Sequence, residues 1–424
     1  MKVLILGGYG AMAQSTVPDL LSSPGVERVG IAGRNASKAE AFAASQRDDR
    51  ATSVSVDARD SADLVRELKR WDCVINSTWY DLNVPITEAA IAAGIHYCDL
   101  GGLYHQTLRQ LKLDSRAKDA GVTCILGIGS TPGTMNVMGR HGATKLDNVR
   151  KVQLRSSGAV VSGGEPGKFV PPYAIRTIFD EFSLDAPILR KGKIRFVPAL
   201  SGLERSEFMP PVGVVEGYYT IHSELATMPK TIGKGVQEMD FIVAFPPEFR
   251  ETVATLVRLG LASREESTVE GTKVRPYDVT SSVIDALPKP KQPELDVDIQ
   301  RCVLVGEKDG NPMTLRYEAV TWPHEKWKVG GGVVDTGVPP SIAAQWLIRG
   351  KVKERGVVPP EIAFDPVPYF QELNARGRKI ATAPDFWATK RRSGFGQSIY
   401  CAFTLVEGRP QMRLPQKRKP VPPF

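Results

Sequence analysis

The sequence is poor in the residues that build metal centres and disulfide scaffolds. It contains five cysteines and five histidines in 424 residues, and no two cysteines have the C-x-x-C spacing of a zinc site. An odd number of scattered cysteines argues against a disulfide framework and is typical of reduced thiols. We therefore predict a cytoplasmic protein that binds no metal ion.

The chain also lacks long apolar runs and the motifs of several enzyme classes. No apolar run approaches the roughly 18 residues that a membrane-spanning helix needs, so no membrane contact is predicted. Because an apolar strand begins at the N-terminus, we expect no signal or transit peptide. The absence of a P-loop, of H-E-x-x-H and of a Ser/His/Asp order excludes kinase, metalloprotease and hydrolase chemistry.

An excess of positive charge is present without a nucleic-acid motif. The formal net charge is +8, and part of the excess lies near the C-terminus, as in Lys390, Arg391 and Arg392. No aromatic residues alternate with these basic ones in a recognisable binding module. We predict no nucleic-acid partner, and interpret the charge as an aid to solubility and to attraction of an anionic cofactor.

The first residues predict a dinucleotide site. Val3-Leu-Ile-Leu6 is a short apolar run typical of a strand buried on both faces. It leads into Gly8-x-Gly10-x-x-Ala13, the G-x-G-x-x-G/A fingerprint of a turn that binds pyrophosphate at a helix N-terminus. The predicted helix covers 11–22, and the turn also assigns Tyr9, Ala11 and Met12 to the cofactor. The alternative is a glycine-rich strand–turn–helix without a ligand.

The second predicted strand, 28–33, favours NADP over NAD. It ends at Gly33 and is followed by Arg34, where NAD-binding chains carry an acid for the ribose hydroxyls. A guanidinium can hold a 2′-phosphate through two parallel hydrogen bonds, with Asn35 and Lys38 just behind it. A solvated charge at a helix start is the alternative. Further predicted cofactor contacts lie at strand ends: Asp57, Asn76, Ser77, Thr78, Gly129 and Pro132.

Strands and helices alternate in the first part of the chain, where a helix is expected at 107–119, and the pattern changes near residue 150. A later helix is expected at Pro340–Arg349. The predicted fold is α/β, with an N-terminal Rossmann-type doubly wound parallel sheet and an α+β second domain with a mostly antiparallel sheet. We predict a Rossmann domain at 1–135, a substrate and dimerisation domain at 136–335, helices returning to the first domain at 336–380, and a partly irregular C-terminal extension at 381–424.

Several blocks together resemble the saccharopine dehydrogenase (saccharopine reductase) superfamily, with lysine 6-dehydrogenase as the nearest branch. The blocks are Val3-Leu-Ile-Leu-Gly-Gly-Tyr-Gly10, Asp72-Cys-Val-Ile-Asn-Ser-Thr-Trp-Tyr80, Asp99-Leu-Gly-Gly102, Gly129-Ser-Thr-Pro-Gly133 and Gly337-Val-Pro-Pro-Ser-Ile-Ala-Ala344. The resemblance implies a homodimer formed through the second sheet. Two departures stand out. Arg34 replaces the acid of NAD-using lysine 6-dehydrogenases, and Thr131 replaces an aspartate that touches substrate in saccharopine reductases.

Five residues are candidates for the chemistry at the expected cleft. Tyr80 follows the fourth strand, and Asp99 opens a glycine turn, each with a structural role as the alternative. Glu216-Gly-Tyr-Tyr-Thr-Ile-His-Ser-Glu224 contributes Glu216 or Glu224 for a substrate ammonium and His222 for proton transfer. A lone histidine is more often structural than catalytic.

The predicted reaction is hydride transfer at a C–N bond, which requires mainly that the protein hold the cofactor and substrate and move one proton. The expected partner is a small amino acid, amine or imine, and the expected cofactor is NADPH. Two alternatives remain open: a lysine 6-dehydrogenase that deaminates a terminal amine with NAD, and a non-catalytic NADP-binding sensor or scaffold.

Overall fold

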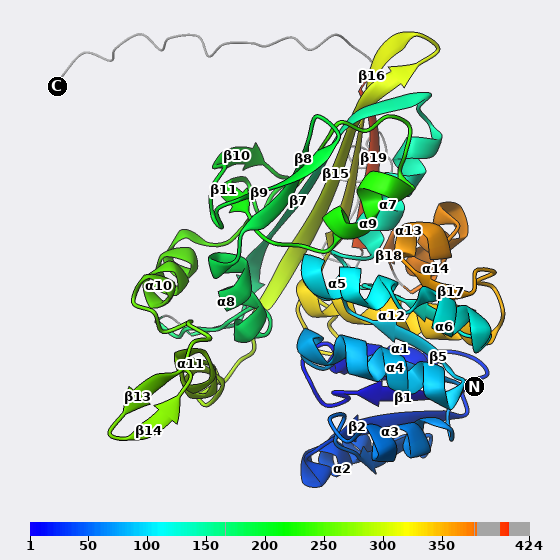
Figure 1. Ribbon diagram of the computed structural model, residues 1–424, viewed down its shortest axis with the longest axis vertical. Coiled ribbons are helices and arrows are strands. Elements are labelled where there is room, and N and C mark those ends of the chain that lie inside the picture. The colour runs from blue at the N-terminus through cyan, green and yellow to red at the C-terminus, as the bar shows by residue number, and fades with distance from the viewer. Residues whose placement is uncertain (166, 377, 380–398, 407–424) are drawn as a thin grey trace.

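The computed structural model describes residues 1–165, 167–376, 378–379 and 399–406. Two sheets organise the molecule (Figure 1): a parallel sheet with helices on both faces and a larger, mostly antiparallel sheet. This confirms the predicted α/β fold class with an α+β second part. In the part of the chain just given, no helix combines the length and apolar character needed to cross a membrane.

The first sheet is parallel and doubly wound, with strand order β17-β6-β5-β4-β1-β2-β3. Its strands are short and most are buried, as the apolar runs predicted. The strands are β1 (Lys2–Leu6), β2 (Arg28–Gly33), β3 (Ala51–Ser55), β4 (Cys73–Asn76), β5 (His96–Asp99), β6 (Thr123–Ile125) and β17 (Gly356–Val358). The helices between them are α1 (Ala13–Ser22), α2 (Ala36–Ser45), α3 (Ser61–Leu68), α4 (Asn83–Ala93), α5 (Tyr104–Leu111) and α6 (Asp114–Asp119).

Two predicted helices differ from the observed ones. The helix expected at 11–22 begins at Ala13, because the chain before it is still part of the glycine turn. The helix expected at 107–119 is two helices, α5 and α6, separated at Lys112 and Leu113. Leu113 is buried there, so the break turns an apolar side chain into the core.

The second sheet has the strand order β10-β11-β12-β7-β15-β16-β19-β18, with β8 paired to β12 and β9 paired to β8. Neighbours are mostly antiparallel, but β7 and β12 are parallel. The strands are β7 (Asn148–Ser162), β8 (Ala186–Arg190), β9 (Lys193–Val197), β10 (Glu204–Glu207), β11 (Val214–Tyr219), β12 (Glu238–Ala244), β15 (Leu295–Lys308), β16 (Asn311–Thr321), β18 (Arg378–Lys379) and β19 (Ile399–Val406). Helices α7 (Thr134–Thr144), α8 (Ile175–Ser183) and α9 (Glu224–Thr231) accompany it.

A small lobe extends from this second part (Figure 1). It contains α10 (Pro247–Arg258), α11 (Pro276–Asp285) and the hairpin β13 (Ser267–Val269) and β14 (Thr272–Val274). Helices α10 and α11 both pack on α8. The lobe is therefore tied to the second part of the molecule through α8.

The chain then returns to the first sheet. Helix α12 (Gly331–Ile348) packs on α1, β4 and β5, and β17 pairs in parallel with β6. Helix α12 begins nine residues before the predicted start at Pro340, and Pro339 and Pro340 lie inside it. Helices α13 (Pro360–Ala363) and α14 (Pro366–Ala375) follow. Apart from β19, which pairs with β16, the predicted extension 381–424 lies outside the described residues.

Candidate functional site

The glycine turn after β1 packs tightly enough to require its glycines. A Cβ on Gly8 would lie 2.7 Å from the Ile5 carbonyl oxygen, and one on Gly7 would lie 2.5 Å from the Ser77 carbonyl oxygen. The N–H of Gly10 donates to the carbonyl of Gly7 at 2.9 Å, which closes the turn. The loop therefore runs directly over the ends of β1, β2 and β4, where a doubly wound sheet binds its ligand.

The N-terminus of α1 is open to an anion. Its N-cap residue, Met12, makes no capping side-chain hydrogen bond, and the first turn contains no acid. Within the described chain, the backbone N–H groups of Ala11 and Met12 have no hydrogen-bond partner. Free N–H groups and the positive end of the helix dipole suit a pyrophosphate, so these residues fit a dinucleotide.

The end of β2 presents basic side chains to solvent. Arg34, Asn35 and Lys38 are exposed, and Arg34 forms no ion pair with any described residue. Tyr9 braces this corner: its ring covers Gly33, where a Cβ would lie 2.5 Å from the ring, and its hydroxyl accepts the Asn35 N–H at 3.2 Å. Arg34 is thus free to bind a phosphate beside the turn.

Strand β4 ends in a cluster of hydrogen-bonded polar side chains that holds the next loop in place. Asn76 is 1% exposed, donates to Asn83 at 2.8 Å and accepts the Thr78 hydroxyl at 2.6 Å. Its role is to shape the loop containing Ser77 and Thr78, which remain partly exposed at the sheet edge. Asp57, after β3, is partly exposed and accepts the Arg59 N–H at 3.0 Å.

The turn after β6 is closed by two glycines in contact. A Cβ on Gly133 would lie 2.1 Å from the Gly129 carbonyl oxygen, and the Gly129 N–H donates to the Pro132 carbonyl at 2.8 Å. The Pro132 ring is buried against Gly101 and Gly127, where a Cβ would lie 2.6 and 2.7 Å from it. Gly129 and Pro132 therefore fix the turn by packing.

Helix α12 joins the cofactor turn, the β6 turn and the second sheet through three consecutive residues. A Cβ on Gly337 would lie 2.4 Å from the Met12 carbonyl oxygen, at the start of α1. Thr336 bonds to the Ser130 hydroxyl at 3.2 Å, in the β6 turn. Asp335 lies within hydrogen-bonding reach of Asp298 on β15. These contacts bring the expected cofactor and substrate regions together.

Asp99 is a structural residue, and the prediction that its carboxylate faces the cleft is wrong. It is fully buried and accepts four hydrogen bonds, from the N–H groups of Gly101 and Gly127 and from the side chains of Tyr97 and Gln110, at 2.7–2.8 Å. Both oxygens are occupied within the interior. Asp99 therefore holds the glycine turn against the β6 loop, which is the structural role considered as the alternative.

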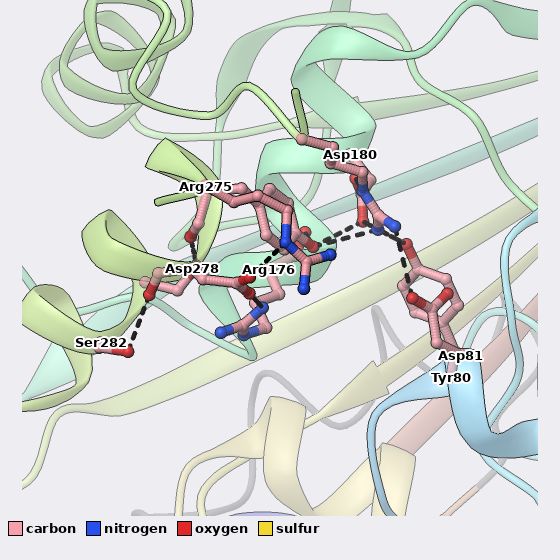
Figure 2. A network of polar contacts seen from close by, with 10 residues as sticks. Tyr80, Asp81, Arg176, Asp180, Arg275, Asp278 and Ser282 are labelled. Atoms are coloured by element: carbon pink, nitrogen blue, oxygen red, sulfur yellow. Dashed lines mark hydrogen bonds and ion pairs between the residues drawn. The ribbon is translucent and has the colours of Figure 1, made fainter. Parts of the chain in front are cut away.

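Tyr80 belongs to a network between the two parts of the molecule (Figure 2). Its hydroxyl makes a short hydrogen bond to Asp180 of α8 and accepts one from Arg264 at 3.0 Å. Arg264 also donates to Asp180 at 2.8 Å, and Tyr277 donates to the same carboxylate at 2.9 Å. Burial and the Asp180 charge raise the pKa of Tyr80 far above its usual value. Tyr80 is 7% exposed and links the domains.

His222 lies at the centre of the strongest candidate for proton transfer. Its Nδ1 contacts the Glu224 carboxylate in a short hydrogen bond, and its ring stacks on Phe241 at 3.9 Å between centroids. Glu224 is fully buried and accepts a second short hydrogen bond, from the Thr131 hydroxyl in the β6 turn. Burial alone would lower the pKa of His222, but Glu224 and Glu181 outweigh it and raise that pKa.

Glu181 is a second buried acid beside the histidine. It is 3% exposed and accepts a hydrogen bond from Tyr173. Burial raises the pKa of Glu181 to about 7, although His222 and Tyr173 act against the increase. Glu216, in contrast, is exposed on β11, opposite Arg205 of β10, and so lies apart from the acids around His222. Of the two glutamates considered with His222, the structure brings Glu224 to it.

Four polar residues of this region were not predicted from the sequence: Glu181, Tyr173, Asp298 and Gln300. One signal was available: Asp296, Asp298 and Gln300 alternate with apolar residues in a strand, which predicts a polar stripe on one face. No group of three or more His, Cys, Asp or Glu side chains that could hold a metal ion occurs among the residues the structure describes.

Comparison with known families identifies the chain. Residues 3–125 match the saccharopine dehydrogenase NADP binding domain, and residues 129–378 match the saccharopine dehydrogenase C-terminal domain. The chain belongs to the saccharopine dehydrogenase family. The resemblance seen in the sequence is thereby confirmed, and the chain is a member of a family of NAD(P)-dependent oxidoreductases that act on C–N bonds.

Two curated relatives in this family are similar over most of their length. The carboxyaminopropylagmatine dehydrogenase of Synechocystis sp. is 22% identical, covering 89% of this chain and 96% of the relative. The carboxynorspermidine synthase of Vibrio alginolyticus is 26% identical, covering 77% of this chain and 81% of the relative.

Solved structures share the family fold. The apo saccharopine dehydrogenase (L-Glu forming) of Saccharomyces cerevisiae aligns with a TM-score of 0.70 at 17% identity, covering 96% of this chain and 99% of that one. The homospermidine synthase of Legionella pneumophila, solved with NAD, aligns with a TM-score of 0.62 at 13% identity, covering 88% and 89%. At these identities the likeness concerns the fold.

Proposed function

We propose that the chain is an NADPH-dependent oxidoreductase that reduces the C=N bond of an imine, formed from an amine and a carbonyl compound, to a secondary amine. One observation carries this proposal: through α12 and Thr131, the protonatable pair His222–Glu224 is joined to the dinucleotide turn. The names of the two curated relatives denote compounds that contain both a carboxyl group and amines.

The residues divide the reaction into binding and proton transfer. A bound NADPH would supply the hydride to the imine carbon. Glu224 and Glu181 raise the pKa of His222 and so favour its protonated form, which would donate a proton to the nitrogen, so that one hydride and one proton complete the amine. Glu224 holds the imidazole by Nδ1, and Thr131 fixes Glu224 in turn. In the reverse direction, the same histidine would accept the proton.

Cofactor choice is the first test. We expect Arg34→Asp to weaken NADPH binding by roughly 10- to 100-fold, because a charge-assisted phosphate contact is replaced by repulsion, and to leave NADH binding nearly unchanged. Fluorescence titration of the purified protein with both cofactors measures this. Arg47→Asp, at the other end of α2, is the matched control. Equal binding of NADH and NADPH by the wild type would contradict the phosphate pocket and favour NAD-dependent deamination.

An activity assay distinguishes an enzyme from a non-catalytic NADP-binding sensor. The purified protein is mixed with NADPH and paired amines and aldehydes, and oxidation of NADPH is followed together with the mass of the product. A secondary amine product supports imine reduction. Release of ammonia from a terminal amine with NAD would indicate the deaminating alternative, and tight NADPH binding without turnover would indicate a sensor. The homodimer and the cytoplasmic location stay predictions.

A further inference from the structure

One face of β15 presents a line of acids toward the nucleotide-binding part. Side chains alternate along a strand, so Asp296, Asp298 and Gln300 share a face with Cys302. Cys302 packs near Gly139 of α7, which identifies this as the inner face of the sheet. Asp298 also lies within hydrogen-bonding reach of Asp335 on α12. The polar stripe thus points toward the elements that carry the cofactor turn.

The acids of this stripe contact hydrogen-bond donors and the carboxyl group of Asp335, but no basic side chain of the described chain. Neither Asp296 nor Asp298 forms an ion pair with a lysine, arginine or histidine of the described chain. Asp296 accepts the Gly332 N–H at 3.0 Å, and Asp298 accepts the Ile299 N–H at 3.0 Å and the Gln300 amide at 2.9 Å. Burial raises the pKa of Asp298 to about 6, and neighbouring Asp296 contributes to the increase. Both acids are partly exposed, and a carboxylate that is held largely away from water without a cation is costly.

A second observation points to a ligand with hydrogen-bond donors. Gln300 is 1% exposed, and its Oε1 is buried without a partner among the described residues. Its amide nitrogen donates to Asp298 at 2.9 Å. This contact fixes the orientation of the amide, because a flipped amide would place its oxygen against the Asp298 carboxylate oxygen. The unsatisfied atom is therefore an acceptor beside a carboxylate. An ammonium or guanidinium group, rich in donors, satisfies both.

The protein handles buried acids differently where no ligand is involved. On the opposite face of the same sheet, Asp240 is 3% exposed and pairs with Arg155 at 2.8 Å and with Arg190 at 2.7 Å. The outer face thus supplies cations for Asp240, whereas structural Asp99 of the first sheet is satisfied by four hydrogen-bond donors instead. In the described chain, Asp296 and Asp298 have neither an ion pair nor as many donors as Asp99, so both keep acceptor capacity for a ligand.

We propose that Asp296, Asp298 and Gln300 of β15, with Asp335 of α12, form a subsite that binds the distal cationic groups of a linear polyamine-type substrate. Alternate residues on a strand are about 7 Å apart, so the stripe suits protonated nitrogens separated by short alkyl chains. The subsite rests on the proposed function, since it selects the amine whose imine would be reduced near His222. The substrate then carries at least one cationic group beyond the reacting nitrogen.

The test measures binding directly, without turnover. Calorimetry on the full-length protein saturated with NADP⁺ compares spermidine with n-butylamine, for the wild type and for Asp298→Asn. We expect spermidine to bind more tightly than the monoamine, and Asp298→Asn to weaken spermidine binding about 10- to 100-fold while leaving n-butylamine binding unchanged. Asp119→Asn, an exposed acid on α6, is the matched control and should bind spermidine as the wild type does.

Three outcomes separate the subsite from the proposed function. Equal binding of both amines, or full spermidine affinity in Asp298→Asn, overturns the subsite even if imines are reduced. Spermidine binding that depends on Asp298, in a protein that neither binds NADPH nor reduces an imine, overturns the proposed function and supports the subsite. Thermal melting shows whether Asp298→Asn folds, and if it does not, Asp296→Asn, at the more exposed end, must show the same loss.

Discussion

The two faces of the second sheet arrange their charged side chains differently. On the outer face, Arg155 contacts Glu204 at 2.7 Å and Asp240 at 2.8 Å, and Arg301 contacts Glu318 at 2.5 Å. On the inner face, the described acids meet backbone N–H groups, an amide, the hydroxyls of Thr131 and Tyr173, and one histidine. Paired charges fix one structure, whereas unpaired buried charges are costly and persist where a ligand or a reaction uses them.

The largest effect is expected when the histidine of the inner face, His222, is replaced. His222→Gln should lower kcat of imine reduction about 10²- to 10⁴-fold, because a positioned proton donor is lost, with little change in NADPH affinity. Steady-state kinetics and cofactor titration measure the two quantities. His105→Gln, an exposed histidine on α5, serves as the control. Unchanged kcat in His222→Gln would remove the proton-transfer role from the inner face.

Removing the ion pairs of the outer face should lower the stability of the fold and not the rate of catalysis. Arg155→Met leaves Glu204 without its partner and Asp240 with Arg190 alone, so we expect a loss of about 3 kcal/mol in the free energy of unfolding. Urea denaturation measures it. Arg150→Met, on the same strand but 60% exposed, should cost less than about 1 kcal/mol. Equal losses in both variants would show that the paired network contributes no more than a surface charge.

Glu181 gives the inner face a pH signature. Its pKa is about 7 in the folded protein, against an ordinary value of 4.5. Between these values the folded state holds a proton that the unfolded state has lost, so stability falls as the pH rises from about 4.5 through 7. His222, Tyr173, Asp180 and Glu224 are the titratable neighbours in this environment.

Glu181→Gln should remove this fall and make the protein more stable than wild type by roughly 2 kcal/mol above pH 7, with little difference near pH 4.5. Urea denaturation across this range tests it. Glu248→Gln, an exposed residue at the start of α10, should show the wild-type dependence. A wild type whose stability does not change across the window would contradict the raised pKa.

The smallest expected effect concerns the junction between the two parts. Tyr80→Phe removes one hydrogen bond to Asp180, which keeps Arg264 and Tyr277, so we expect a loss of about 1 kcal/mol in the free energy of unfolding. Tyr104→Phe, at the start of α5, is the comparison. If Tyr80→Phe lowered the free energy of unfolding as much as Arg155→Met does, the junction would contribute as much to stability as the ion pairs of the outer face.

Local patterns in the sequence were enough to predict the first sheet and its cofactor turn. The apolar run Val3–Leu6, the glycines after it and Arg34 belong to one strand–helix–strand unit, where spacing along the chain determines position in space. The family blocks were recognisable for the same reason, and the family models confirm them.

The partners of the polar residues depended on the tertiary structure. Asp99 was predicted at the cleft, but the core that surrounds it supplies four donors from three segments of the chain. The contact between Thr131 and Glu224 spans 93 residues, and that between Tyr80 and Asp180 spans 100.

The sequence by itself determined the parallel sheet, the dinucleotide turn and the family, because those features are local in the chain. Only the tertiary structure decided which acids are paired with arginines and which surround His222. Charge pairing depends on distances between strands that are far apart in sequence, and the energy of a buried carboxylate is set by its neighbours in space.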